Sequence, residues 1–319
     1  MVSFIIPHKG REELLIHTLH SIFAQQCEQQ IEVIVVSQNE NFGAERMFAQ
    51  KHNLQVIKAS TDLTISALRN YGAKLAQGKY FAFLDADIEL AADWLNNLLA
   101  TLTSNTDIAL VSALQKNSHD APPLEKIRTA LSNADIDSYV SFLPGRNLLL
   151  SAEMFHQVNG FPEHLTTCED YYFTNKVAEF GKLYYCSKSH YVHLGEDKEY
   201  LAMFKKEIWR GQSNLQSISG RIPPLRELPS FIIPLFILLL FIIAAYSIIT
   251  LQSQLFIYAV ALIALPVALY SIRLFIVADK KISIRHILAF YLLYFPARAI
   301  GTLLSIKTWI QTLGDKAND

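Results

Sequence analysis

Cysteine is scarce in this sequence, and the cysteines present are scattered. The 319 residues include Cys27, Cys168 and Cys186, with no Cys-x-x-Cys pair and no Cys/His spacing of the kind that binds zinc. An odd and dispersed set of this size argues against a disulfide-stapled scaffold and indicates reduced thiols. We therefore expect the body of the protein to lie in the cytosol.

The sequence also lacks an excess of either charge. Its net charge is -1, whereas a general nucleic-acid binder needs a concentrated basic face, so no nucleic-acid partner is expected. It contains neither the G-x-G-x-x-G pattern nor the G-x-x-x-x-G-K-[ST] pattern, which argues against an ordinary dinucleotide site or P-loop. Because 18% of the residues are charged and 51% are hydrophobic, the chain is not a disordered tail.

Charged residues are absent altogether from residues 229–272. Two apolar runs, at about 230–250 and 254–277, flank a short polar break, and each is long enough to span a hydrocarbon core of about 30 Å as a helix. The backbone of a spanning segment must satisfy its own polar groups, so both runs are predicted to be helices joined as a hairpin. Residues 221–319 are thus predicted to form a membrane region.

Basic residues flank this hairpin on both sides. Arg221 and Arg226 precede it, and Arg273, Lys280 and Lys281 follow it, whereas the turn carries no charge. The positive-inside rule then places both ends of the hairpin in the cytosol. The chain opens on a short apolar run rather than a signal peptide, so we expect the body of the protein to stay on the cytosolic side of the membrane.

A third apolar run, at about 284–306, carries Arg298 near its middle. An arginine at mid-membrane costs roughly 2.5 kcal/mol or more on insertion scales. This run is expected to lie in the interface or re-enter the membrane, with a spanning helix as the alternative. In the first case Arg298 would lie among lipid phosphates, and in the second it would face protein.

The remaining sequence alternates short apolar runs with helical patterns. Strands are predicted at 2–6, 31–36, 56–57, 80–84 and 108–114, and amphipathic or helical stretches lie between them. This order predicts an α/β fold with a parallel sheet. The polar residues 117–137 are expected to form a loop, and 182–186 and 190–193 two short strands.

Asp85 and Asp87 follow the strand at 80–84. Ligands bind at the carboxyl ends of strands in open α/β sheets, and carboxylates at i and i+2 of an extended chain point to the same side. Such a pair can share a hard cation such as Mg²⁺ or Mn²⁺, although a solvated turn would have the same residues.

Several motifs occur together in a fixed order. Val-Ser-Phe-Ile-Ile-Pro opens the chain, a helix containing Arg69 leads to Phe-Leu-Asp-Ala-Asp at 83–87, and Gly-Phe-Pro-Glu at 160–163 precedes Glu169-Asp170. This order resembles the family 2 glycosyltransferases of the GT-A fold, over about residues 1–195. The resemblance implies a Rossmann-like GT-A domain over 1–220 that uses a nucleotide-sugar, by default a UDP-sugar.

The resemblance also implies roles for particular residues. Asp170 would be the general base of an inverting transfer, with Glu169 beside it to orient. Asp85, Asp87 and His193 would hold the divalent metal, Mn²⁺ or Mg²⁺. Arg146 and Asn147 would lie near the acceptor and the donor sugar. The residues implied in donor binding are Pro7, Lys9, Arg11, Gln38, Asn39, Arg69, Asp85 and Asp87.

One segment departs from the family pattern. Relatives often end the second strand with an acidic turn that binds the uracil ring, whereas this chain has Ser37-Gln38-Asn39-Glu40. Three readings therefore stay open: a transferase acting on a lipid-linked or growing saccharide acceptor in surface polysaccharide assembly, a transferase that loads polyprenyl phosphate directly, and a non-catalytic scaffold. Asp87 is followed by Ile88-Glu89 rather than Leu-Gln-Asp-Pro, which disfavours the second.

Overall fold

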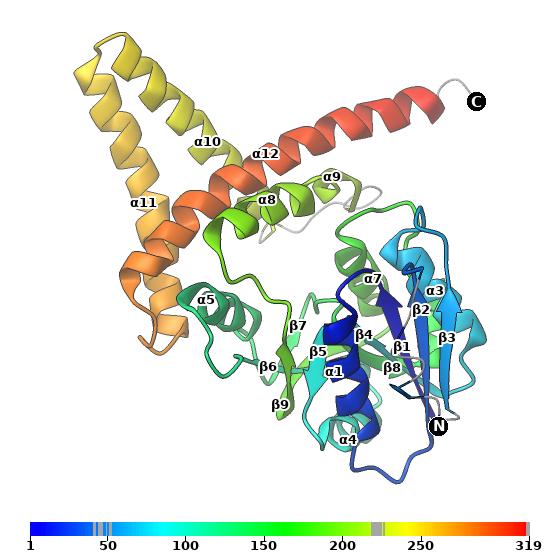
Figure 1. Cartoon of the computed structure of the whole chain (residues 1–319). Helices are drawn as coiled ribbons and strands as arrows, with labels where there is room; N and C mark the ends of the chain where they lie inside the picture. Colours follow the sequence, from blue (N-terminus) through cyan, green and yellow to red (C-terminus); the bar gives the residue numbers. More distant parts are fainter. Residues whose placement is uncertain are drawn as a thin grey trace. The chain divides into compact units, whose positions relative to one another are not determined.

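The computed structural model (Figure 1) describes residues 1–40, 43, 47–48, 50, 53–217, 225 and 227–316, with side chains to residue 306 except at 216 and 217. Arg221, Arg226 and the predicted domain boundary after residue 220 lie outside the described residues. The chain divides into two compact units. Unit 1 holds Met1–His119 and Asp135–Glu196, and unit 2 holds Asp120–Ala134 and Asp197–Asp319.

Unit 1 is built on one mixed sheet. Its described strands are β1 (Val2–His8), β2 (Ile31–Ser37), β3 (Leu54–Lys58), β4 (Tyr80–Leu84), β5 (Ile88–Leu90), β6 (Ile108–Lys116), β7 (Ser138–Val140), β8 (Asn147–Ser151) and β9 (Lys182–His193). They follow the order β3-β2-β1-β4-β8-β6-β9-β5, with β7 paired to β9. The described helices of this unit are α1 (Glu12–Phe23), α3 (Ile65–Leu75), α4 (Trp94–Ser104), α6 (Ala152–Gln157) and α7 (Glu169–Ala178).

The expected α/β class is confirmed, and the strands expected up to residue 114 run parallel, but the sheet also contains antiparallel strands. The strands β3, β2, β1 and β4 are parallel, as crossover helices require. β8 then pairs antiparallel with both β4 and β6, and β5 pairs antiparallel with β9. The sequence does not reveal this change because β8 is as apolar as the parallel strands and is buried in the same way.

Two local expectations also need correction. The expected strands at 182–186 and 190–193 are one strand, β9, whose register against β6 shifts between Ala113 and Leu114. The expected loop at 117–137 contains the helix α5 (Pro123–Ser132). Pro123 stands at the start of α5, where proline's missing N–H costs nothing, so it begins a helix rather than breaking one.

Two faces of the sheet are covered by separate apolar clusters. Helices α1 and α4 cover one side, where Leu15 and Trp94 are fully buried. On the other side lies an aromatic cluster in which Phe161 stacks on Phe173 with centroids 4.0 Å apart. The carboxyl ends of β1, β2 and β4 stay uncovered by these clusters and carry the polar residues described below.

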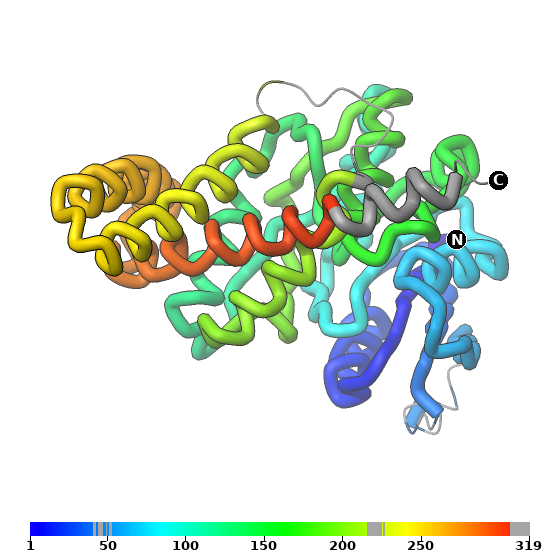
Figure 2. The backbone as a smooth tube through the Cα atoms, turned by 90° about the horizontal axis from the view of Figure 1, so that it is seen from above, coloured from blue at the N-terminus to red at the C-terminus, as the bar shows by residue number. Residues whose placement is uncertain are grey.

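Unit 2 is helical. Its described helices are α5, α8 (Tyr200–Gly211), α9 (Asn214–Ser217), α10 (Leu228–Ile249), α11 (Ser253–Val277) and α12 (Ile284–Lys316). Figure 2 shows α10, α11 and α12 as the yellow to red part of the tube. The three predicted apolar helices are confirmed, and each is long and apolar enough to cross a membrane, with mean hydropathies of 2.9, 2.3 and 1.6 in chain order.

Candidate active site

The loop that follows β1 is tied to the end of β2. The backbone N–H of Gly10 donates to the Asn39 Oδ1 at 2.7 Å, and Asn39 Nδ2 donates to the Gly10 carbonyl at 3.2 Å. Gly10 has a φ of +73°, a conformation that a side chain would strain. Asn39, predicted to bind the donor, therefore holds the loop that presents Lys9 and Arg11, both of which are exposed.

Two other predicted donor residues face the interior. Pro7 is buried within β1, beyond the last residue that pairs with β4, where its missing N–H breaks no ladder bond on that side. Gln38 is buried, and its Nε2 donates to the carbonyls of Ser60 at 2.7 Å and Leu63 at 3.0 Å. These contacts attach the segment after β2 to the loop at residues 60–63.

Arg69 joins two acidic segments that lie far apart in the sequence. Its Nη2 donates to Asp85 Oδ1 at 2.8 Å and its Nη1 donates to Glu169 Oε1 at 2.9 Å. The Arg69 side chain is only 2% exposed, and its guanidinium lies 4.9 Å from the centroid of the Phe161 ring. Burial alone would lower the pKa of Arg69, but the carboxylates of Asp85 and Glu169 raise it, so the guanidinium stays charged.

The helix α7 begins with the acidic pair Glu169-Asp170. Asp170 Oδ2 accepts a hydrogen bond from the backbone N–H of Gly145 at 3.0 Å. A Cβ at Gly145 would lie 2.9 Å from Asp170 Cβ, so glycine permits this close approach. Burial and the adjacent Asp170 raise the pKa of Glu169 to about 7 in spite of Arg69. The two carboxyl groups therefore have different environments despite being neighbours.

Asp87 lies between two cationic or basic side chains. Arg11 Nη2 donates to its Oδ2 at 2.7 Å, and His193 Nε2 lies 3.3 Å from its Oδ1. A Cβ at Gly195 would lie 2.0 Å from Asp87 Oδ2, which no side chain could tolerate without moving the carboxylate. The sequence reasoning missed Gly195, since nothing in the primary structure links it to Asp87.

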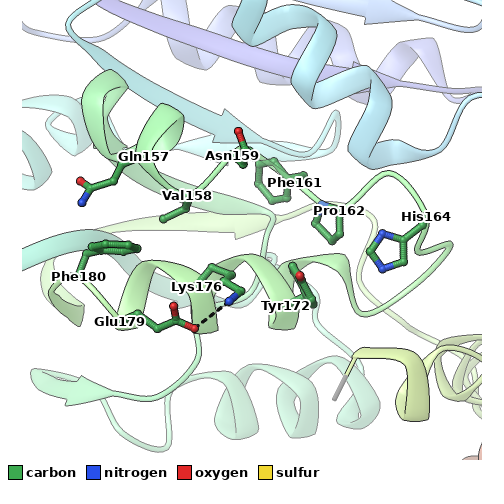
Figure 3. A pocket seen from close by; sticks show the side chains of 11 residues that line it. Gln157, Val158, Asn159, Phe161, Pro162, His164, Tyr172, Lys176, Glu179 and Phe180 are labelled. Carbon is green, nitrogen blue, oxygen red and sulfur yellow. Dashed lines mark hydrogen bonds and ion pairs between the residues drawn. The ribbon is translucent and has the colours of Figure 1, made fainter. Parts of the chain in front are cut away.

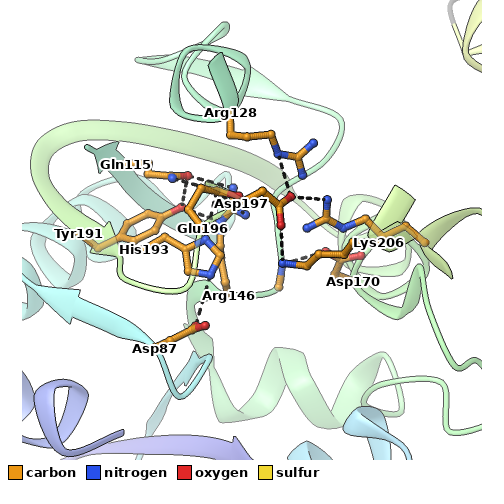
Figure 4. A network of polar contacts seen from close by, with 12 residues as sticks. Asp87, Gln115, Arg128, Arg146, Asp170, Tyr191, His193, Glu196, Asp197 and Lys206 are labelled. Atoms are coloured by element: carbon orange, nitrogen blue, oxygen red, sulfur yellow. Dashed lines mark hydrogen bonds and ion pairs between the residues drawn. The ribbon is translucent and has the colours of Figure 1, made fainter. Parts of the chain in front are cut away.

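A buried polar chain stands behind His193 (Figure 4). Its Nδ1 lies 3.1 Å from Glu196 Oε2, and that carboxylate accepts from Gln115 Nε2 at 3.1 Å. Burial alone would lower the pKa of His193, but its hydrogen bonds to Asp87 and Glu196 raise it. The sequence reasoning also missed Glu196, because in the sequence it is simply the first of two adjacent acids, Glu196 and Asp197, after the last strand.

The two predicted sugar-binding residues occupy different environments. Arg146 donates from Nε to the Tyr191 hydroxyl and from Nη2 to Gln115 Oε1, each at 3.0 Å. Asn147 is fully buried, and its Oδ1 accepts from Ala113 N at 3.1 Å and Trp94 Nε1 at 3.3 Å. This position suits a structural role for Asn147, with Arg146 nearer the polar chain behind His193.

Asp87 and His193 are of the residue types that could hold a divalent cation. No group of three or more His, Cys, Asp or Glu side chains is arranged to hold a metal within the part of the chain that the structure describes. Asp87 and His193 nonetheless direct an oxygen and a nitrogen at each other. A cation there would take the place that the Arg11 guanidinium now occupies on the Asp87 carboxylate, and it would need the neutral form of His193. A cation bound to these two residues would take its other ligands from water or a phosphate group.

A separate open pocket of about 460 Å³ lies along one face of α7 (Figure 3). Its walls include Val158, Phe161, Tyr172 and Phe180. None of the predicted donor, metal or base residues lines it, so it is distinct from the acidic site.

Comparison with solved structures defines the class of the fold. A mannosyltransferase from Pyrobaculum calidifontis, solved in complex with GDP-Man and Mn²⁺, aligns with 95% of this chain and 86% of its own, at 19% identity and a TM-score of 0.66. GalNAc-T7, solved with UDP, GalNAc and Mn²⁺, aligns over 72% of this chain and 53% of its own, at 15% identity and a TM-score of 0.51. The fold is that of the GT-A glycosyltransferases.

The sequence comparisons then define the family. Residues 3–158 match the model of glycosyl transferase family 2. Glycosyltransferase AglE of Haloferax volcanii is 24% identical over 56% of this chain and 62% of its own length, and an uncharacterized glycosyltransferase of Rickettsia conorii is 28% identical over 58% and 32%. The matches thus span less than two thirds of these relatives. Residues 3–158 thus form a family 2 glycosyltransferase domain, as the order of the motifs predicts.

Proposed function

We propose that the protein is a membrane-anchored, inverting glycosyltransferase that moves a sugar from a nucleotide-sugar to a lipid-linked or growing saccharide acceptor. The observation that carries the proposal is the link made by Arg69, which joins Asp85 at the end of β4 to Glu169 at the start of α7, next to Asp170. This link supports the proposal that the acid assigned to the donor and the acids assigned to the acceptor share one site in unit 1. Such an enzyme would serve the assembly of surface polysaccharide or another glycoconjugate.

In this proposal Asp170 is the general base. Its carboxylate takes the proton of the acceptor hydroxyl as that oxygen bonds to the anomeric carbon of the donor sugar. The bond between the anomeric carbon and the β-phosphate oxygen breaks at the same time, and the nucleoside diphosphate leaves with the electron pair. One displacement of this kind inverts the anomeric centre. Glu169 and Arg69 would position the base.

The donor diphosphate would lie at the ends of β1 and β4. Lys9 and Arg11 are exposed there and carry charge of the sign that a diphosphate requires. Asp87 and His193 would hold a Mn²⁺ or Mg²⁺ ion, with Asp85 nearby. A bound cation of this kind neutralises negative charge that develops on the leaving group. Two of the solved relatives contain Mn²⁺, which supports this assignment.

The proposal also covers the nucleotide base of the donor. A UDP-sugar is the first candidate, and a GDP-sugar is the second, because the solved relatives were obtained with UDP and with GDP-Man. The amide of Gln38 is occupied by backbone carbonyls, so base recognition would use other groups at the end of β2.

The apolar helices support a place at a membrane. Anchoring would hold the site close to a lipid-borne acceptor and raise its effective concentration. Arg273 near the end of α11, and Lys280 and Lys281 after it, support a cytosolic catalytic domain at the inner membrane.

The test uses the purified full-length protein in detergent, offered UDP- and GDP-sugars with Mn²⁺ and a bacterial lipid extract. We expect release of nucleoside diphosphate from one donor, loss of release with EDTA, and sugar on an extracted lipid-linked acceptor. Polyprenyl phosphate alone as acceptor would identify the direct-loading alternative. Absence of binding to every nucleotide diphosphate in calorimetry with Mn²⁺ would contradict the proposal and favour a scaffold.

A further inference from the structure

In the third apolar helix, α12, the side chain of Arg298 faces a neighbouring helix of the protein. Arg298 Nε lies 3.4 Å from Glu207 Oε2, and Glu207 belongs to α8, another helix of unit 2. Arg298 is therefore paired with a carboxylate within the same unit, and the expectation that an interfacial α12 would place it among lipid phosphates is wrong. Glu207 itself contacts further charged side chains. These charges restrict where α12 can lie relative to a membrane.

Glu207 is the centre of a charged cluster. Its side chain is 2% exposed, and besides Arg298 it binds Arg210 and accepts from Arg128 Nη1 at 3.0 Å. Lys206 Nζ in turn lies 3.0 Å from Asp197 Oδ1, and Arg210 pairs with the same carboxylate, as Figure 4 shows for Asp197 and Lys206. This cluster of charged groups is connected directly to Arg298. Moving it into hydrocarbon would cost several kcal/mol per ion.

The helix α8 accompanies α12 over most of its apolar part. The Tyr200 hydroxyl donates to the His286 carbonyl at 3.2 Å near one end. A Cβ at Gly211 would lie 2.8 Å from Gly301 Cα near the other, so the two backbones nearly touch. Because the contacts run from His286 to Gly301, α12 cannot enter a membrane over this length without α8 and its charges.

The other two apolar helices behave differently. The most apolar windows of α10 and α11 are 28% and 22% buried, against 44% for α12. Large apolar side chains such as Leu239, Ile242 and Leu265 are at least half exposed on the hairpin, with respect to the part of the chain that the structure describes. Figure 1 shows α12 crossing the base of the α10–α11 hairpin rather than running along it.

We propose that only the α10–α11 hairpin spans the membrane, and that α8 and α12 lie flat against the lipid headgroups on the side where the hairpin begins and ends. The partner of this two-helix layer is an anionic lipid surface. An exposed stripe on α8 consists of Leu201, Lys205 and Trp209, at positions i, i+4 and i+8. A helix that lies in a membrane interface typically exposes such a combination of apolar, basic and tryptophan side chains. The inference does not depend on the proposed transfer reaction.

The first experiment compares the two ends of the full chain in cells. A short split-fluorescent-protein tag is placed before Met1, after Asp319 or in the turn at Leu251–Gln252, and its partner fragment is expressed in the cytosol. The proposal predicts that both terminal tags report the same side and the turn tag reports the opposite side. Terminal tags on opposite sides would mean that α12 spans, and would overturn the proposal.

The second experiment uses matched lysine substitutions at exposed leucines near the middle of two helices. Leu292→Lys lies in α12 and Leu239→Lys in α10, and the readout is the fraction of protein that resists carbonate extraction from membranes. We expect Leu292→Lys to leave that fraction unchanged and Leu239→Lys to reduce it about tenfold or more. An equal loss for both variants would contradict an interfacial α12.

Discussion

At the scale of single residues, the proposed metal ligands depend on neighbouring residues that keep them in position. Asp87 can meet a cation only if its carboxylate keeps its position against Gly195, and His193 can do so only if its ring keeps its orientation against Glu196. Neither Gly195 nor Glu196 is a predicted metal ligand, but Gly195 lies against Asp87 and Glu196 contacts His193. Two predictions follow from these contacts.

Gly195→Ala is expected to weaken Mn²⁺ binding by about tenfold or more. The added Cβ would fall 2.0 Å from Asp87 Oδ2, so the carboxylate or the loop must shift. A 1 Å error in a metal or substrate contact is enough for a loss of this order. Electron paramagnetic resonance of free Mn²⁺ measures the affinity. Gly43→Ala is the control, because among the described residues a Cβ there meets only Glu12 Oε1, at 3.4 Å. Equal affinities for the two variants would contradict the prediction.

Glu196→Gln is expected to weaken Mn²⁺ binding by about 10- to 100-fold, the usual effect of losing a carboxylate behind a ligating histidine. The Glu196 carboxylate accepts from Nδ1 of His193 and so leaves Nε2 directed at Asp87. Isothermal titration calorimetry with Mn²⁺ is the measurement. The exposed Glu199→Gln controls for the loss of one charge. Unchanged Mn²⁺ affinity in Glu196→Gln would show that this carboxylate does not position the histidine.

At the scale of helices and strands, unit 2 depends on one buried acid. Glu207 of α8 lies among Arg128 of α5, Arg210 of its own helix and Arg298 of α12. Burial alone would raise the pKa of Glu207, but these three arginines lower it to about 2. The carboxylate therefore links three helices of the unit.

Glu207→Gln is expected to destabilise unit 2 by about 3 kcal/mol at neutral pH, from a pKa lowered from 4.5 to about 2. A lowered folded-state pKa contributes stability above the unfolded value, and that contribution is lost as pH falls from about 4.5 toward 2. The difference in melting temperature between wild type and Glu207→Gln in detergent should thus be full at pH 7 and shrink below pH 4.5. A difference that is small at pH 7, or that grows in acid, would refute the ionic role.

Much of the architecture at this scale could be predicted from the sequence. The apolar helices and the strands 31–36 and 80–84 are long or regular enough for their pattern to decide the structure. The antiparallel β8 and the helix α5 could not be predicted, because buried strands of either direction are equally apolar and Pro122-Pro123 has the composition of a loop. In the site, motif order indicated Asp85, Asp87 and Asp170, whereas Gly195 and Glu196 act through contacts that no spacing reveals.

At the scale of the whole molecule, the proposed enzyme combines a nucleotide-sugar site with a membrane anchor. In vesicles at a fixed lipid-to-protein ratio, transfer to a lipid-linked acceptor should keep its rate when the suspension is diluted with buffer, since enzyme and acceptor stay in one bilayer. In detergent the same dilution should lower the rate in proportion. Rates that fall equally in both preparations would mean that anchoring does not deliver the acceptor.

The central claim is that Asp87 serves the donor and its cation while Asp170 takes the acceptor proton. The direct test measures both nucleoside diphosphate binding with Mn²⁺ and sugar transfer for wild type, Asp87→Ala and Asp170→Asn. We predict that Asp87→Ala loses binding and transfer, whereas Asp170→Asn keeps binding and loses transfer by about 10²- to 10⁴-fold. Transfer at the wild-type rate in both variants would contradict the claim.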